Sequence, residues 1–201
     1  MKAATRNEKT GNILTPAGVL LWNSLFNPRK NKNGTPGKYE FNIAIPKGAD
    51  LKVLEEAVLE AGKEKFPKAF REANGKWPTG IKSPFKKTAE NQKLVDAGIA
   101  ESHPRFFAAR SADKPGLVGP NAKAEGIDPE QVYAGRIVRA TVQAYGYDKD
   151  GNKGVSLGLI NVQLLDQGDE LVIGGGRVSA ESEFEGVEGE GTEGGAGGMF
   201  D

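Results

Sequence analysis

The residues best suited to binding a ligand lie in the segment 137–147, where small and larger side chains alternate. Successive side chains of a strand point to opposite faces. One face would carry the small residues Val138, Ala140, Val142, Ala144 and Gly146. The other would carry Arg139, Thr141, Gln143, Tyr145 and Tyr147. Two rings beside a guanidinium suit a single nucleic-acid strand, because bases stack on rings and cations neutralise phosphates. Alternatively, the tyrosines cover a second hydrophobic layer, with their hydroxyls at its edge.

Two further segments combine aromatic and basic side chains. "GIKSPFKK" (80–87) could form a binding loop, although a solvated turn is the ordinary interpretation. "RFFAAR" (105–110) could do the same, although at least one of its phenylalanines must belong to the core. We therefore predict a basic, aromatic groove built from several segments. Stacking is assigned to Tyr145, Tyr147, Phe85 and Phe107. Phosphate contacts are assigned to Lys86, Lys87, Arg110, Arg139 and Lys153.

Signals for catalysis or metal binding are weaker. His103 is the only histidine and the chain has no cysteine, so a Cys/His zinc site is excluded and His103 is expected at the surface. "DKDGNKG" (148–154) places glycine at the wrong position for a calcium loop, and no phosphate-binding loop motif occurs. We predict no cofactor, no metal and no catalytic residue. Scattered acids leave a metal-dependent nuclease as the alternative, and a virion structural protein as a third possibility.

The net charge of zero conceals a strong asymmetry along the chain. All 27 Lys and Arg residues lie at or before Arg177, and seven acids follow that position. Residues 1–180 thus carry 27 bases against 20 acids, a net charge of +7. A basic body with an acidic tail is common in nucleic-acid binders, whereas a tail that merely keeps the protein soluble is the alternative.

The periodicities predict the elements that would position these residues. Segments 12–26 and 38–46 are predicted strands joined by a basic loop, and an amphipathic helix capped by Asp50 should end before Pro67. Residues 136–165 predict a long hairpin with its turn at 148–154, whereas 67–130 show no sustained period. We predict a mainly β fold: a five-stranded antiparallel barrel of the oligonucleotide-binding (OB) type with one substantial helix and long loop insertions. Residues 1–180 would form this domain, and 181–201 a disordered acidic tail.

The hairpin segment also carries a resemblance to a known family. "VYAGRIVRATVQAYGYDKDGNKGVSLGLINVQLLDQGDEL" (132–171) resembles the C-terminal signature of the tailed-phage single-stranded DNA-binding proteins with an OB fold, and similarity covers most of residues 12–175. The resemblance implies sequence-independent binding of single-stranded DNA in phage replication or recombination, without catalysis. The first residues show no basic start followed by an apolar run, so we expect a cytosolic protein, which for such a phage protein is the bacterial host cytoplasm. Homo-oligomers are left open.

The chain ends in "EGEGTEGGAGGMFD" (188–201), which pairs acids and glycines with Met199, Phe200 and Asp201. With its acids and its near-terminal Phe200, this tail resembles the tails of bacterial single-strand binders and of the replication binder of short-tailed coliphages. We expect the carboxylates and Phe200 to occupy the basic groove as substitutes for phosphate and base. DNA would displace the tail, which would then contact phage replication or recombination proteins.

Overall fold

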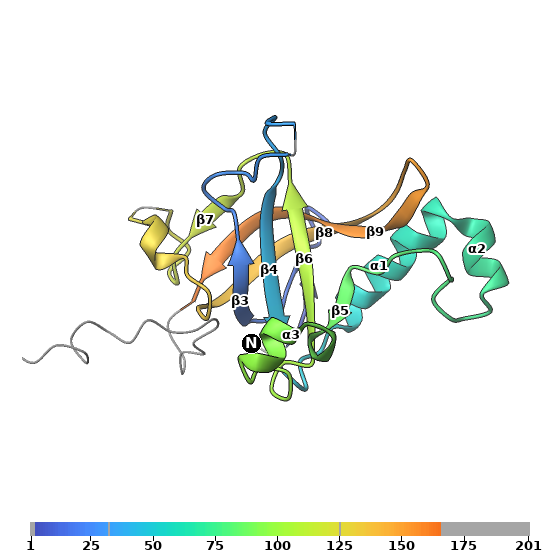
Figure 1. The fold of residues 1–201 in the computed structure, drawn as a ribbon, viewed down its shortest axis with the longest axis horizontal. Coiled ribbons are helices and arrows are strands. Elements are labelled where there is room, and N and C mark those ends of the chain that lie inside the picture. The colour runs from blue at the N-terminus through green and yellow to red at the C-terminus, as the bar shows by residue number, and fades with distance from the viewer. Residues whose placement is uncertain (1–2, 32, 125, 166–201) are drawn as a thin grey trace, which may run out of the picture.

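Five strands form a closed ring in the computed structural model, which describes residues 3–31, 33–124 and 126–165 (Figure 1). They are β3 (Gly18–Asn23), β4 (Tyr39–Ile45), β6 (Arg105–Ser111), β8 (Ile137–Lys149) and β9 (Asn152–Leu164). β3 pairs with β4, β4 with β6, β6 with β9, β9 with β8, and β8 with β3 again. All pairs are antiparallel except β6 and β9. This ring is the predicted OB barrel, in which the third and fifth strands lie parallel.

Short strands extend the ring at its margins. They are β1 (Thr5–Arg6), β2 (Ile13–Leu14), β5 (Phe85–Lys87) and β7 (Gly116–Val118). β2 pairs with β8, whereas β5 pairs with β6 and β7 with β9. The single strand predicted at 12–26 is therefore two strands, divided at Thr15-Pro16. The buried Thr15 hydroxyl accepts the backbone N–H of Ala140 at 3.0 Å, which holds this break against β8.

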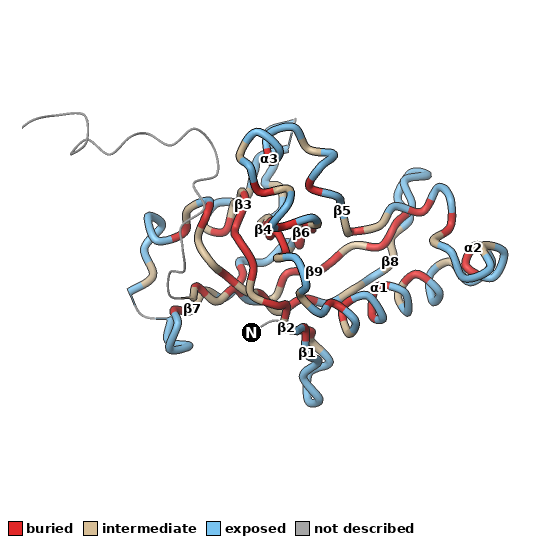
Figure 2. The backbone as a smooth tube through the Cα atoms, turned by 90° about the horizontal axis from the view of Figure 1, so that it is seen from below, coloured by how far each residue is buried: buried red, intermediate tan, exposed pale blue. Residues whose placement is uncertain are grey.

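Helix α1 (Lys52–Lys65) lies alongside β8 in both views and is followed by α2 (Pro67–Glu72) (Figures 1 and 2). Leu54, Ala57 and Val58 form its buried face. The β8–β9 hairpin projects beyond the barrel along this helix (Figure 1). Contact is close at Gly146, where an added Cβ would collide with the Lys65 side chain and lie 3.1 Å from the Ala61 carbonyl oxygen. The distal half of the hairpin is thus supported by α1.

A second apolar layer covers part of the barrel's outer surface. The 3₁₀ helix η1 (Thr88–Glu90) and helix α3 (Gln92–Asp96) bring Leu94 and Ile99 against Leu21, Ala44 and Phe106. Another 3₁₀ helix, η2 (Pro129–Gln131), precedes β8 and is capped by Asp128. In the part of the chain that the structure describes, no helix is long and apolar enough to cross a membrane.

Strand β6 lies within residues 67–130, where the sequence shows no sustained period and the elements could not be placed. Phe106 packs outside the barrel wall under α3, whereas Phe107 packs inside the barrel. Because both faces of this strand are apolar at this point, the sequence shows no alternation that would predict it.

Candidate nucleic-acid interface

A cleft of about 390 Å³ brings both predicted tyrosines together with basic side chains. We call it the tyrosine cleft; it is lined by Lys38, Arg110, Tyr145, Tyr147, Lys149, Asn152 and Ser156. These residues come from the end of the β3–β4 loop, from β6 and from the outer part of the β8–β9 hairpin. Three cations therefore surround two aromatic rings without a carboxylate among the lining side chains.

Cross-strand neighbours set the position of the two rings. Tyr145 pairs with Ser156 and Tyr147 with Gly154 across the hairpin. Because glycine has no side chain, the Tyr147 ring lies directly against β9: a Cβ added at Gly154 would be 2.7 Å from the Tyr147 Oη. Tyr145 lies near Gly158 in a looser way, at 3.7 Å from such a Cβ, and is 38% exposed. Tyr145 therefore does not seal a second core layer.

Arg110 of β6 lies between the hairpin strand β9 and the barrel strand β4. It pairs with Gly158 of β9 on one side and with Glu40 of β4 on the other. Its Nε donates to Glu40 Oε2 at 2.8 Å, and Asn42 Nδ2 donates to Glu40 Oε1 at 2.8 Å. Burial alone raises the pKa of Glu40, but the Asn42 hydrogen bond and the charges of Arg110 and Arg29 outweigh it and lower the pKa below 4.5. At neutral pH Arg110 thus faces an ionised carboxylate, with which a phosphate would have to compete.

The position of the cleft in the barrel agrees with the general behaviour of OB folds. Their ligands bind across the second and third strands and the loops that join strands one to two and four to five. In this chain those strands are β4 and β6, and those loops are residues 24–38 and the β8–β9 turn. Arg110 lies on β6, Lys38 ends the first of these loops, and Lys149 is the last residue of β8, directly before the turn.

Residues 12–194 match the model of a family described as Enterobacter phage Enc34, ssDNA-binding protein. The chain belongs to this family. A curated relative is protein p50 of Acyrthosiphon pisum secondary endosymbiont phage 1, which is 35% identical over 80 residues. That match covers 40% of this chain and 42% of the relative, less than half of either protein.

Solved structures show the same fold. The single-stranded DNA-binding protein of bacteriophage Enc34 in complex with ssDNA aligns with a TM-score of 0.67 at 18% identity, covering 85% of this chain and 94% of that one. The gp2.5 single-stranded DNA-binding protein of bacteriophage T7 aligns with a TM-score of 0.54 at 13% identity, covering 84% of this chain and 99% of that one. The resemblance to phage single-strand binders and the OB fold are both confirmed.

Two aromatic residues predicted to contact DNA lie elsewhere in this member of the Enc34 family. The Phe107 ring is 0% exposed inside the barrel, so its predicted stacking role is wrong. Phe85 stands edge-on to Phe107 with the ring centroids 6.1 Å apart. It therefore faces the core side of β5 and lines a separate hollow beside Trp77 and Leu59.

The two lysines of β5 point to opposite sides of the strand. The Lys86 ammonium lies 5.7 Å from the Phe106 ring centroid, so Lys86 shares the outer face of the barrel with Arg110. Lys87 points the other way and forms an ion pair of 3.5 Å with Glu90. Neither lysine lines the tyrosine cleft, and Lys86 is the one that shares its face.

Arg139 and Lys153 are also outside the tyrosine cleft. Arg139 precedes Tyr145 by six residues, about 20 Å along a strand, and its Nε donates to Gln163 Oε1 at 2.7 Å. Lys153 pairs with Asp148 across the hairpin, and their side chains form an ion pair of 3.5 Å. Lys153 and Asp148 belong to the face of the hairpin opposite Tyr147. The alternation of side chains along β9 places Lys153 on that face, so its position outside the cleft could have been predicted from the sequence.

Sequence reasoning missed four lining residues: Lys38, Lys149, Asn152 and Ser156. Lys149 continues the alternation of Tyr145 and Tyr147, which could have identified it. The predictions for the acidic tail, including Met199, Phe200 and Asp201, concern residues outside those that the structure describes.

His103 is not the surface residue that the sequence led us to expect. It is 9% exposed, and its Nδ1 lies 2.9 Å from the Ser102 hydroxyl. Burial lowers the pKa of His103. Within the described residues, no three His, Asp or Glu side chains are grouped to hold a metal ion.

Proposed function

We propose that this protein binds single-stranded DNA without sequence preference and without a catalytic step, in phage DNA replication or recombination in the bacterial host cytoplasm. One observation supports this function above the others. The tyrosine cleft combines stacking rings with cations at the place where OB folds bind their ligands, in a chain of a family of single-strand binders.

Each part of the cleft has a physical role in this proposal. Tyr145 and Tyr147 stack on successive bases, a contact that any base can make because every base has a π-face. Lys38, Lys149 and Arg110 neutralise the phosphates between them. Since cations and rings read neither base edges nor sequence, the binding is sequence-tolerant and falls as salt rises.

The test is a titration of labelled oligo-dT, duplex DNA and single-stranded RNA at two salt concentrations, followed by anisotropy. Wild-type protein should bind oligo-dT more tightly than duplex. A Tyr145→Ala/Tyr147→Ala variant should bind about 25-fold or more weakly, because each stacked base contributes about 1–3 kcal/mol. The matched control is Lys63→Ala, an exposed lysine on α1 outside the cleft.

Two outcomes would contradict the proposal. Equal binding of the double variant and the wild type would remove the tyrosine cleft from the interface. Cleavage of labelled single strands with magnesium or manganese would instead favour the nuclease alternative.

We also propose that the acidic C-terminal tail competes with DNA for the tyrosine cleft and is available to partner proteins when DNA is bound. The seven acidic residues after Arg177 carry the charge opposite to that of the basic residues that line the cleft. A tethered competitor acts at millimolar effective concentration, so a weak contact suffices. Removing residues 181–201 should tighten binding of oligo-dT at low salt. Equal affinity with and without the tail would rule out competition.

A further inference from the structure

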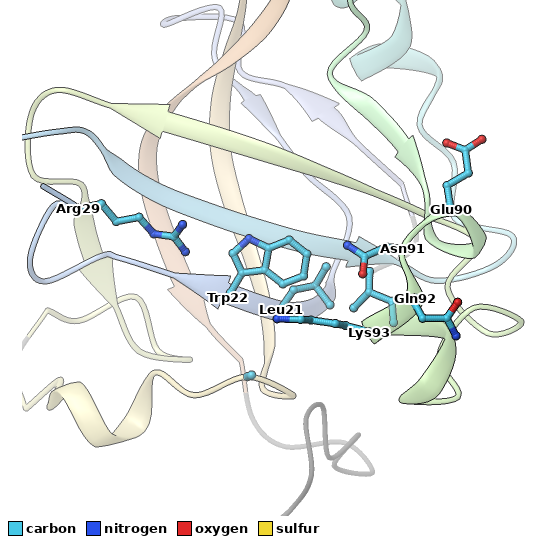
Figure 3. A pocket seen from close by; sticks show the side chains of 9 residues that line it. Leu21, Trp22, Arg29, Glu90, Asn91, Gln92 and Lys93 are labelled. Carbon is cyan, nitrogen blue, oxygen red and sulfur yellow. The ribbon is translucent and has the colours of Figure 1, made fainter. Parts of the chain in front are cut away.

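A larger groove, of about 810 Å³, includes Leu21 and Trp22 of β3 (Figure 3). We call it the Trp22 groove; it is lined by Leu21, Trp22, Arg29, Glu90, Asn91, Gln92, Lys93, Leu94 and Ala134. Strands β3 and β6 flank β4, so Trp22 and Arg110 of the tyrosine cleft lie on opposite sides of the strand that carries Glu40. Figure 3 shows the Arg29 and Lys93 side chains extending toward Trp22, whereas the Glu90 carboxylate points away. Glu90 also forms the ion pair with Lys87. The inner part of the groove is therefore aromatic and positively charged.

The Trp22 ring lines this groove and is held in place by packing against the core. The pairing of β3 with β4 shifts register between Leu20 and Asn23, so this irregularity contains Trp22. The ring stands edge-on to the buried Phe106, with centroids 5.8 Å apart and an interplanar angle of 67°. Trp22 remains only partly buried. A ring held on one edge by the core and partly open to solvent can stack on a base without first being ordered.

The Trp22 groove and the tyrosine cleft belong to one continuous face. Asn42 Nδ2 donates to the Trp22 carbonyl oxygen at 3.1 Å and to Glu40 Oε1 at 2.8 Å. Glu40 in turn accepts from Arg110 of the tyrosine cleft, and the charge of Arg29 in the Trp22 groove also lowers the pKa of Glu40. From β3 to β9 this face spans three strand spacings, an arc of about 14 Å.

We propose that the Trp22 groove is a second subsite for the same DNA strand, in which Trp22 stacks on a base while Arg29 and Lys93 bind the neighbouring phosphates. This subsite rests on the proposed function, since it extends the path of a strand held in the tyrosine cleft. The Glu40 carboxylate lies between the two subsites. The strand therefore bridges a negative position, and its tightest contacts lie at the two ends.

Fluorescence of Trp22 tests the subsite directly. A Trp77→Phe variant leaves Trp22 as the sole tryptophan, because the chain has two. Oligo-dT of about 16 nucleotides, the upper end of OB-fold site sizes, should quench this emission as anisotropy reports binding. Binding without any change in Trp22 emission would overturn the subsite.

Charge removal gives a second measurement that does not depend on Trp77. Lys93→Ala removes an exposed cation and should reduce the slope of log affinity against log salt by about 0.7 for the long oligonucleotide, while Lys63→Ala should leave it unchanged. Trp22→Leu should weaken binding about 5- to 150-fold, the loss expected for one stacked base, and its unfolding temperature shows whether loss of the Phe106 contact unfolds it.

The two proposals fail in different ways. If Tyr145→Ala/Tyr147→Ala weakens binding but Lys93→Ala leaves the salt slope unchanged, the tyrosine cleft stands and the Trp22 subsite falls. If the wild type does not prefer single strands, the proposed function itself fails.

Discussion

Gly154 permits the closest contact in the tyrosine cleft, so Gly154→Ala is the sharpest test of how the cleft is built. A Cβ at this position would be 2.7 Å from Tyr147 Oη, 2.8 Å from Tyr147 Cζ and 2.9 Å from the Lys82 carbonyl oxygen. Contacts of carbon atoms below about 3.5 Å are repulsive. The Tyr147 ring must therefore leave its position against β9.

The size of the effect follows from what the ring loses. If displacement of Tyr147 removes one stacked base, affinity for oligo-dT falls by about 1–3 kcal/mol, or about 5- to 150-fold. The contact with the Lys82 carbonyl adds a cost to folding of about 1–3 kcal/mol, typical of an overpacked site. Binding and stability must therefore be measured on the same variant.

Gly158→Ala is the matched control, since it adds the same methyl group four residues along β9. There the new Cβ would be 3.6 Å from the Gln143 carbonyl oxygen and 3.7 Å from Tyr145 Cε1, which are ordinary contacts. We expect its affinity to stay within about twofold of the wild type. Anisotropy titration of oligo-dT and thermal unfolding of both variants compare them. Equal affinities for the two variants, with Gly154→Ala folded, would refute the role of the Tyr147 position.

Three further substitutions should change DNA binding or stability in a defined direction. Glu40→Gln removes the carboxylate that binds Arg110, and oligo-dT affinity should rise about fivefold at low salt and less at high salt; an unchanged or lower affinity in a folded variant would contradict this. Lys149→Ala should reduce the salt slope of binding by about 0.7, and an unaltered slope would place Lys149 outside the interface. The pKa of His103 is below 6.5, so the unfolded chain takes up its proton first as pH falls. Stability to urea should therefore drop as pH falls through about 6.5, less so in His103→Gln; equal losses in both proteins would exclude His103 as the source.

The sequence predicted the hairpin and its tyrosines because β8 is apolar on one side only. Val138, Ala140 and Val142 are buried, and Tyr145 on the alternate face is exposed. Strand β6 was missed for the opposite reason, since Phe106 and Phe107 are both buried on opposite faces. Periodicity reports a difference between the two faces of a strand, and at Phe106 and Phe107 both faces are equally buried.

The composition of the site depended on contacts that no local pattern contains. Arg110 and Glu40 are 70 positions apart, so their ion pair becomes visible only when β4 and β6 lie side by side. Arg139 illustrates the reverse case. It is an arginine, as Arg110 is, and it shares a face of β8 with Tyr145. It lies about 20 Å from Tyr145 along the strand, however, and is therefore outside the tyrosine cleft.

The packing of the β8–β9 hairpin on α1 has a kinetic consequence. Gly146 lets β8 lie against Lys65 and Ala61 of α1. The part of the hairpin that carries Tyr145 and Tyr147 is therefore held in position before a ligand binds. Ordering of side chains and loops is one of the main entropic penalties of association. We therefore expect this penalty to fall chiefly on the flexible polynucleotide, and the rate of encounter to be governed by diffusion and charge attraction and not by a slow rearrangement of the protein.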